Sequence, residues 1–390
     1  MRVLFLVSGG GGFPQYGAYA NRVISMARGL HSIGQQVEIV YVFSGKYNLS
    51  SKSGTYENIR YLYMIKPQPA KNKFHKALQY IHGIIGAILY IYKVNKIQPI
   101  ILISCFHGFI TNPIWLITRW LKIPIIRELN EFPFSTTFKN PTNLTKYDIF
   151  KIRMDLFLFS GFISISTQLQ QFLVSLFPDK PNLHIPINVQ PENFSHRVPS
   201  PINKYITYVG TISNYKDGIS DLLQAFFIAG KEVSDIYLRL IGGGSKDDID
   251  KLKGMISKSG FNDRVSFTGL MDRKQAVNLM LESYILVLAR PDNTLALGGF
   301  PTKLGEYLAT GIPVLVTAVG DIPLFLKHGE NAFLAKPGDY QDFAEKLLDI
   351  VNNYDNALAV AQRGQYLTYN DFNYIKQAYL INDFLLAIGQ

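Results

Sequence analysis

The residues best suited to chemistry lie in the stretch from Gly298 to Thr317, which contains Lys303 and Glu306. Pro301 suits the first turn of a helix, because the N–H that proline lacks would have no partner there. Gly311 suits the left-handed position that follows the last turn. The spacing therefore predicts a glycine loop, a short helix, a glycine stop and a buried strand.

Lys303 and Glu306 share one face of this predicted helix with Thr310, apart from the apolar stripe at 304, 307 and 308. The helix follows Gly298 and Gly299, and the first amides of a helix bind anions. A lysine adds a phosphate contact, and a carboxylate accepts hydrogen bonds from sugar hydroxyls. An ordinary helix–strand unit with a solvated Lys/Glu pair explains the same local pattern, so both interpretations stay open.

Length and composition place this stretch in a folded protein with room for two domains. The chain has 390 residues, of which 47% are hydrophobic. Its single cysteine, Cys105, excludes an internal disulfide framework and fits a reducing compartment. The apolar run after Arg2 is too short for a signal peptide, so a cytoplasmic location is expected.

Charge is distributed unevenly along the chain. Residues 1–200 contain 21 Lys and Arg against 8 Asp and Glu, whereas residues 201–390 contain 18 against 21. A polyanion or an anionic membrane surface is therefore the expected partner of the first half. Nucleic acid is the weaker candidate, because the basic stretch is interleaved with apolar runs and matches no nucleic-acid motif.

The segment from Lys66 to Lys96 has the strongest membrane character. Lysines flank the apolar and aromatic run Leu78–Tyr92 on both sides, and its fifteen residues are too few to span a bilayer comfortably. A basic apolar helix lying in the membrane interface is one interpretation, and a helix buried inside the domain is the other.

The first half alternates strands and helices. A strand at 3–7 leads into a glycine loop, which lacks the dinucleotide fingerprint because Pro14 stands where a third glycine is needed. Gly10, Gly11 and Gly12 allow a ligand to approach the backbone closely, and a plain tight turn is the alternative. The N-terminal domain is expected to span residues 1–186.

Polar side chains follow two later strands of this half. His107 follows the strand at 99–104, and Asn130 and Glu131 follow the strand at 124–127. Ligands of open α/β sheets gather at the carboxyl ends of strands, so these three are candidate catalytic residues. The alternatives are a structural hydrogen bond for His107 and a turn-capping role for Glu131.

The second half restarts the same alternation after a proline-rich connection at 178–201. This predicts an α/β fold with two doubly wound domains facing across a cleft. Lys216 and Arg290 follow strand ends and suit a nucleoside diphosphate. Asp248 and Asp250 have a spacing that can hold a metal, but a mixed-charge helix start explains them better, and no metal site is expected.

The second half resembles the donor domain of family 4 glycosyltransferases, which have the two-Rossmann GT-B fold. The matching residues are Tyr208-Val209-Gly210 with Lys216 six positions later, 238–244, 265–269 and 299–314. The run Phe-Pro-Thr-Lys-Leu-Gly-Glu-Tyr-Leu at 300–308 is similar to that of enzymes that assemble bacterial polysaccharides. Weaker matches lie at 9–12 and 185–194.

The resemblance implies a retaining hexosyltransferase without a metal or other cofactor, whose donor is a nucleotide sugar, with a UDP-sugar favoured. It implies an acceptor-binding domain at 1–186, a donor-binding domain at 187–371, and a final helix within 372–390 that crosses back to the first domain. The donor-binding residues expected from motifs and resemblance together are Gly10, Gly11, Gly12, Gly210, Lys216, Gly243, Val265, Arg290, Gly298, Gly299, Phe300, Pro301, Thr302, Lys303 and Glu306.

Within this set, the resemblance places the leaving diphosphate on Lys216 and loop amides, and the ribose on Glu306. Two positions depart from the family pattern. Thr211 stands where the family has an arginine, a charge for which Arg290 and Lys303 are candidates. Gly298 stands where the family has a sugar-side acid, so sugar identity is not carried over.

The expected function is transfer of a hexose or N-acetylhexosamine to a lipid-linked or glycan acceptor. The product would be a capsule, O-antigen (lipopolysaccharide) or exopolysaccharide, made by a cytoplasmic enzyme that is peripheral on the inner face of the plasma membrane. A sugar-nucleotide epimerase of the same architecture and a non-catalytic sugar-nucleotide or glycan-binding homologue are the alternatives.

Overall fold

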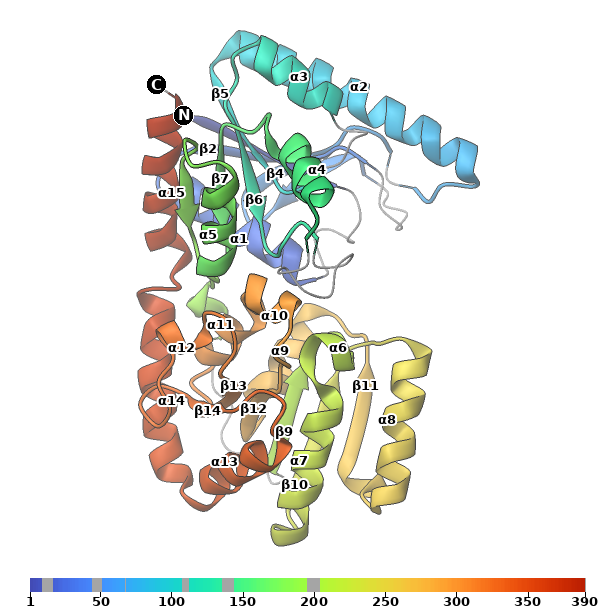
Figure 1. Cartoon of the computed structure of the whole chain (residues 1–390), viewed down its shortest axis with the longest axis vertical. Helices are drawn as coiled ribbons and strands as arrows, with labels where there is room; N and C mark the ends of the chain where they lie inside the picture. Colours follow the sequence, from blue (N-terminus) through green and yellow to red (C-terminus); the bar gives the residue numbers. More distant parts are fainter. Residues whose placement is uncertain are drawn as a thin grey trace. The chain divides into compact units, whose positions relative to one another are not determined.

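A computed structural model describes residues 1–8, 17–43, 51–66, 68–106, 112–134, 144–194 and 204–389 (Figure 1). Their contacts divide the chain into two compact units. Unit 1 comprises Met1–Asn188 and Tyr374–Gln390, and unit 2 comprises Val189–Asn373. Each unit is an α/β layer structure built on its own sheet.

The sheet of unit 1 has the strand order β3-β4-β2-β1-β5-β6-β7-β8 and is parallel except where β3 pairs with β4. Three of its inner strands, β5, β6 and β7, are buried along their whole length, as parallel strands covered on both faces must be. The strands are β1 (Arg2–Val7), β2 (Gln36–Tyr41), β3 (Ser53–Tyr56), β4 (Ile59–Tyr63), β5 (Ile100–Ser104), β6 (Ile125–Leu129), β7 (Gly161–Ser164) and β8 (Asn182–His184).

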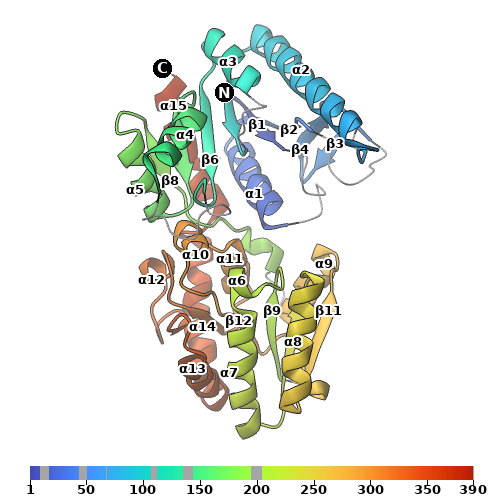
Figure 2. The ribbon, with the colours of Figure 1, turned by 45° about the vertical axis from the view of Figure 1, so that its right-hand side comes forward.

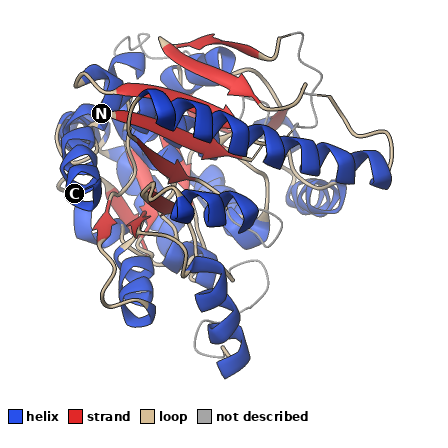
Figure 3. Cartoon of the chain, turned by 90° about the horizontal axis from the view of Figure 1, so that it is seen from above, coloured by secondary structure: helices blue, strands red, loops and turns tan. Residues whose placement is uncertain are grey.

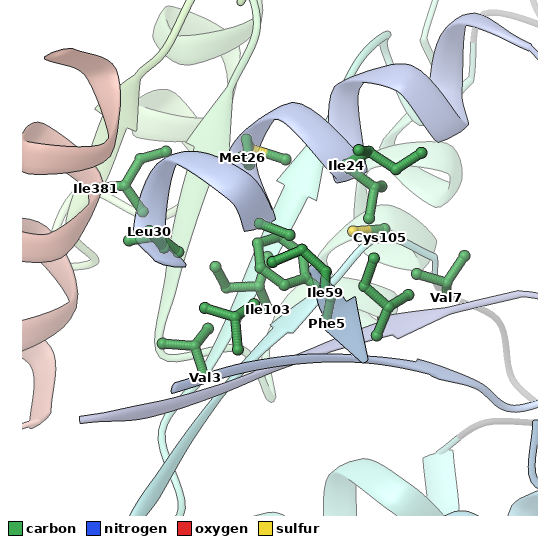
Figure 4. Packing of buried hydrophobic residues seen from close by; sticks show 14 of the residues in the cluster. Val3, Phe5, Val7, Ile24, Met26, Leu30, Ile59, Ile103, Cys105 and Ile381 are labelled. Atoms are coloured by element: carbon green, nitrogen blue, oxygen red, sulfur yellow. The ribbon is translucent and has the colours of Figure 1, made fainter. Parts of the chain in front are cut away.

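The core of unit 1 lies between this sheet, helix α1 and the last helix of the chain. Side chains of β1, α1 and β5 interdigitate there, with the thiol of Cys105 among them and Ile381 contributed from the C-terminal end (Figure 4). The helices of this unit are α1 (Ala18–Ser32), α2 (Lys73–Ile97), α3 (Asn112–Trp120), α4 (Lys146–Leu156), α5 (Thr167–Leu176) and α15 (Tyr374–Gly389).

The last helix returns to unit 1, as expected from the resemblance. Helix α15 packs against α1, and at Gly29 the two backbones come so close that a β-carbon there would lie 2.4 Å from the carbonyl oxygen of Tyr374. A larger residue at Gly29 would push the helices apart. Only glycine therefore leaves enough space for the two helices to pack this closely.

Helix α2 is longer than the fifteen residues expected, because it spans 25 residues from Lys73 to Ile97. Figure 3 shows it passing over the strands of unit 1. By length and composition alone it could cross a membrane, and it is the only described helix that meets this criterion. Its inner face is buried at Ala87 and Ile91, and Gly83 packs against the backbone of Val42.

Unit 2 has an entirely parallel sheet with the strand order β11-β10-β9-β12-β13-β14. Its strands are β9 (Lys204–Val209), β10 (Ile236–Ile241), β11 (Val265–Gly269), β12 (Ile285–Leu288), β13 (Val314–Thr317) and β14 (Phe333–Ala335). Short helices gather where β9 and β12 end, among them α6, α10 and α11 (Figure 2).

The helices of unit 2 connect these strands and cover the sheet, with α7 and α13 packed against each other. They are α6 (Asn214–Asp217), α7 (Ile219–Glu232), α8 (Lys246–Ser259), α9 (Arg273–Leu281), α10 (Thr294–Gly298), α11 (Thr302–Ala309), α12 (Ile322–Phe325), α13 (Tyr340–Asn352) and α14 (Tyr354–Tyr369). Two 3-10 turns, at Pro191–Phe194 and Asn262–Arg264, complete the unit.

Candidate functional site

Helix α11 carries the predicted charged pair and is held in place by its apolar face. Leu304, Tyr307 and Leu308 are fully buried, and the backbone of Gly311 is left-handed with φ 68°, as the sequence predicted. The prediction for Thr310 was wrong. This residue is buried rather than on the charged face, because its hydroxyl donates to the carbonyl oxygen of Tyr307 at the helix end (2.6 Å).

The segment that precedes α11 is a short helix and a two-residue link, and not the expected glycine loop. Gly298 is the last residue of helix α10, which Asn293 caps by accepting a hydrogen bond from the Ala296 N–H (2.9 Å). Only Gly299 and Phe300 connect it, in extended backbone, to the N-cap residue Pro301 of α11. The expected loop is thus a tight link between two helices.

Lys303 lies in a buried ion pair. Its ammonium donates to Asp217 Oδ2 at 2.7 Å and to the Tyr208 hydroxyl at 3.1 Å. The side chains of Lys303 and Asp217 are 16% and 1% exposed. Arg290 Nε lies 3.9 Å from the other oxygen of the same carboxylate. Asp217 therefore gathers two cations where β9 and β12 end.

The ammonium of Lys303 also lies directly against Gly210. A β-carbon at Gly210 would be 2.1 Å from Lys303 Nζ, and the backbone there has φ 152°, which favours glycine. Thr211 comes next, at the position where an arginine was expected. Of the two candidates for the missing charge, Lys303 contributes the atom nearest to this position of Gly210.

Burial and charge together perturb the pKa values in this cluster. Burial alone would raise the pKa of Asp217, but Lys303 and Arg290 outweigh it and leave that pKa lowered. Burial lowers the pKa of Lys303, an effect that Asp217 partly offsets. Burial, followed by the charge of Asp217, raises the pKa of Tyr208 well above its usual value. The carboxylate of Asp217 is thus kept ionised close to Gly210.

Glu306, the expected ribose ligand, pairs with a residue that the sequence did not single out. Arg273 Nη1 donates to Glu306 Oε1 at 2.9 Å, and the two side chains are 34% and 19% exposed. Arg273 is the first residue of α9. The two charged residues of α11 therefore each face an oppositely charged partner from another element.

Of the remaining predicted donor residues of unit 2, Lys216, Gly243 and Arg290 lie in segments that follow strand ends, whereas Val265 lies at the start of a strand. Lys216 is exposed at the end of α6, close enough to Lys303 to lower its pKa. Gly243 packs against Leu270, and Val265 begins β11 and pairs with Leu238. Arg290 is 4% exposed, and its carbonyl oxygen accepts a hydrogen bond from the Thr317 hydroxyl (2.7 Å).

Of the predicted residues of unit 1, Gly10, Gly11, Gly12 and His107 lie outside the described part of the chain. Asn130 donates to Glu128 Oε2 at 3.1 Å, whereas the neighbouring Glu131 is exposed.

Glu128 in turn forms a fully buried ion pair with Arg22 (2.7 Å), whose other nitrogens bind the carbonyl oxygens of Ile185 and Pro186. Asn130 is therefore fixed by a structural network at the end of β6. Catalytic roles for His107, Asn130 and Glu131 stay predictions.

Asp248 and Asp250 have helix-start roles in the structure. Asp248 Oδ2 accepts a hydrogen bond from the Ser245 hydroxyl (2.7 Å), and Asp250 pairs with Lys246 (2.9 Å) on the exposed first turns of α8. Within the described ranges, no group of three or more His, Cys, Asp and Glu side chains is arranged to hold a metal ion. Metal independence stays a prediction.

Comparison with known proteins identifies the fold class and a family that matches part of the chain. The whole chain has the GT-B fold of glycosyltransferases. It superposes on the crystal structure of Anabaena HepE in complex with UDP and glucose with a TM-score of 0.75. The two sequences are 16% identical, and the superposition covers 99% of this chain and all of that one. Residues 190–366 match the family described as glycosyl transferases group 1. The resemblance to GT-B glycosyltransferases is thereby confirmed.

Two curated relatives cover parts of the chain. N-acetyl-alpha-D-glucosaminyl L-malate synthase of Bacillus anthracis is 24% identical over 163 residues, which are 41% of this chain and 40% of that protein. The amylovoran biosynthesis glycosyltransferase AmsK of Erwinia amylovora is 24% identical over 191 residues, or 48% and 46%. The matched part thus spans less than half the length of these relatives.

Sequence reasoning missed Asp217 and Arg273 as members of the site, and it matched Tyr208 to the family motif without assigning it a role. Asp217 directly follows the predicted Lys216. An acid among the cations at a strand end was the available signal for Asp217. Arg273 left no signal, because its pairing with Glu306 joins residues 33 positions apart.

Proposed function

We propose that this chain is a retaining glycosyltransferase that moves a hexose or N-acetylhexosamine from a nucleotide sugar to a lipid-linked or glycan acceptor. The observation that carries the proposal is the position of Lys303 against Gly210, beside the first turn of α11. A cation against a glycine backbone suits a diphosphate, whose departure it assists by stabilising its charge, and the first amides of the helix that carries the lysine would add to this. The match of residues 190–366 to glycosyl transferases group 1 supports the same activity.

The donor is a UDP-sugar in this proposal. Support comes from Anabaena HepE, whose structure with the same fold contains UDP and glucose. Lys216 and Lys303 contact the diphosphate, and Glu306 accepts hydrogen bonds from the ribose hydroxyls. The pathway is assembly of a cell-surface polysaccharide, in line with the name of the amylovoran relative. No metal or other cofactor takes part, and the sugar keeps its configuration.

The test of the donor site is titration of UDP, GDP and ADP and their sugars against the wild-type chain and three variants. Lys216→Ala, Lys303→Ala and Glu306→Ala should each weaken UDP binding about tenfold or more, which is ~1.4 kcal/mol for each factor of ten. Lys253→Ala, which removes an exposed lysine from α8, is the matched control and should bind UDP as the wild type does. Wild-type affinity in all three site variants would refute the assignment.

The reaction class needs a separate test, because an epimerase of the same architecture would also bind the donor. A transferase releases UDP from the UDP-sugar only after a glycan or lipid-linked acceptor is added. An epimerase converts the nucleotide sugar without an acceptor, and a non-catalytic binding protein converts nothing. With an acceptor present, His107→Ala, Asn130→Ala and Glu131→Ala test the predicted acceptor-side roles by their effect on turnover.

We also propose that unit 1 lies on the cytoplasmic, anionic surface of a membrane through the segment 66–96. One face of α2 exposes large apolar side chains at intervals of three and four residues, namely Phe74, Leu78, Ile81, Ile85, Leu89 and Tyr92. Lys71, Lys73, Lys76, Lys93 and Lys96 flank this face at both ends. Apolar area together with cations is what an interfacial helix needs.

The inner face of α2 argues for lying on the membrane rather than crossing it. Ala87 and Ile91 are completely buried in unit 1, so a spanning helix would have to leave its packing. Trp120 and Leu116 of the adjacent α3 are also exposed. Sedimentation with anionic vesicles at low salt tests the proposal. Wild-type protein should bind, and Ile81→Asp/Ile85→Asp should not. Failure of the wild type to sediment would refute it.

A further inference from the structure

Arg273 occupies a position that the fold fixes before any ligand arrives. It is the first residue of α9, where the N-cap Asp272 accepts a hydrogen bond from the Gln275 N–H (2.8 Å) and Gln275 Oε1 accepts one from the Asp272 N–H (3.3 Å). This capping box sets the direction in which the helix begins. The guanidinium of Arg273 then meets Glu306 of α11 at 2.9 Å.

A carboxylate in a site for a diphosphate carries an electrostatic cost. The negative charges of Glu306 and of a diphosphate bound nearby would repel each other. The guanidinium beside Glu306 offsets this repulsion. It also holds the carboxylate in one orientation, and a carboxylate offers about four acceptor positions, which is more than the contact with Arg273 uses.

We propose that Arg273 is a positioning residue for the nucleoside end of the donor, acting by orienting and neutralising the Glu306 carboxylate that receives the ribose hydroxyls. The inference rests on the proposed function, in which Glu306 is the ribose ligand. Arg273 itself need not touch the donor. The part of its contribution that comes from orienting Glu306 should therefore disappear when the hydroxyls that Glu306 receives are removed from the ligand, and only the charge compensation should remain.

The experiment compares two probes, UDP and its 2′,3′-dideoxy analogue, by calorimetric titration of the full chain. Arg273→Ala should weaken UDP binding about tenfold and weaken binding of the dideoxy analogue clearly less, because the analogue keeps the diphosphate but has no hydroxyls for Glu306 to receive. Arg273→Lys, which keeps the charge but not the planar fork, should recover part of the loss. Arg273→Ala/Glu306→Ala should bind UDP no more weakly than Glu306→Ala.

Lys274→Ala is the matched control, because it removes one cation at the next position of α9, where the side chain is exposed. It should bind both probes as the wild type does. Equal weakening of both probes by Arg273→Ala, or the same loss in Lys274→Ala, would overturn the role of Arg273. Thermal melting of each variant identifies any that fails to fold, and Arg273→Lys then decides the question.

The two proposals fail in different ways. If Glu306→Ala binds UDP as the wild type does, the ribose assignment is refuted and the role of Arg273 is refuted with it. If Glu306→Ala loses UDP affinity while both Arg273 variants retain it, the donor site stands and only the positioning role is refuted.

Discussion

At the scale of single residues, Asp217 organises the site more than the lysines that the motifs emphasise. Its carboxylate is almost completely buried, binds Lys303 directly, and lies 3.9 Å from Arg290. Without it, two cations would face each other inside unit 2. Asp217 thus allows a lysine to be placed against Gly210, where a diphosphate would need it.

Removal of the Asp217 charge should therefore be costly. Asp217→Asn keeps the shape but leaves Lys303 and Arg290 without their common counter-charge, and breaking a buried ion pair typically costs about 3 kcal/mol or more. Urea denaturation followed by circular dichroism measures the loss. A loss below about 1 kcal/mol would mean that water reaches the pair and screens it.

The lowered pKa of Asp217 also predicts a direction for the pH dependence of stability. The carboxyl has a lower pKa in the folded chain than in the unfolded chain, whose value is about 3.9. Its contribution is therefore complete above that pH and is lost as the pH falls through the folded value. Between pH 6 and 3, the wild type should lose more stability than Asp217→Asn. Parallel curves would contradict this.

Gly210 gives a prediction with an internal control. In Gly210→Ala the new methyl group would overlap Lys303 Nζ, so the ammonium must move and UDP affinity should fall by about tenfold or more. Gly254 lies in α8 with no atom within 4 Å of where its β-carbon would be. Gly254→Ala should therefore keep its UDP affinity and gain up to about 1 kcal/mol in stability. Equal UDP affinities in the two variants would argue against the site.

At the scale of elements, the sequence predicts well what local spacing determines. The helix between Pro301 and Gly311 and the apolar stripe at Leu304 and Leu308 are found as expected, because periodicity and glycine chemistry are local. The alternation of strands and helices in both halves predicts the parallel sheets for the same reason.

The expectations that failed concern contacts and helix ends. Thr310 is buried because its hydroxyl satisfies a carbonyl group of its own helix, and Gly298 belongs to a helix that Asn293 caps. Helix α2 is longer than expected because lysines at both ends of the apolar run belong to the helix and do not lie outside it. The pairing of Glu306 with Arg273 depends on how helices α9 and α11 lie in the fold, and the spacing of residues in the sequence does not predict that arrangement.

At the scale of the whole molecule, the two units differ sharply in charge. Unit 1 contains 21 Lys and Arg against 8 Asp and Glu, and unit 2 contains 18 against 21. A surplus of this kind on one unit favours an anionic partner for that unit alone. Together with the exposed apolar face of α2, it supports a membrane-bound unit 1.

The charge surplus makes membrane binding depend on salt. Each lysine near an anionic surface contributes about 1 kcal/mol, and the attraction decays over a Debye length of roughly 10 Å at 0.1 M salt. Vesicle binding should therefore weaken as salt rises from 0.05 to about 0.5 M. It should also weaken when neutral lipid replaces anionic lipid. Binding that is unaffected by either change would mean that the apolar face alone is responsible.

The buried position of Cys105 has a practical consequence. The residue follows β5 in the core of unit 1, its side chain is shielded from water, and burial raises the pKa of its thiol. A thiol reagent can therefore reach it only when this core opens. Because the chain contains one cysteine, the rate at which a thiol reagent modifies Cys105 measures how often that core opens, without any engineered label. This rate reports on unit 1 alone. Comparing it with and without vesicles would show whether membrane contact makes opening of the core beneath α1 less or more frequent.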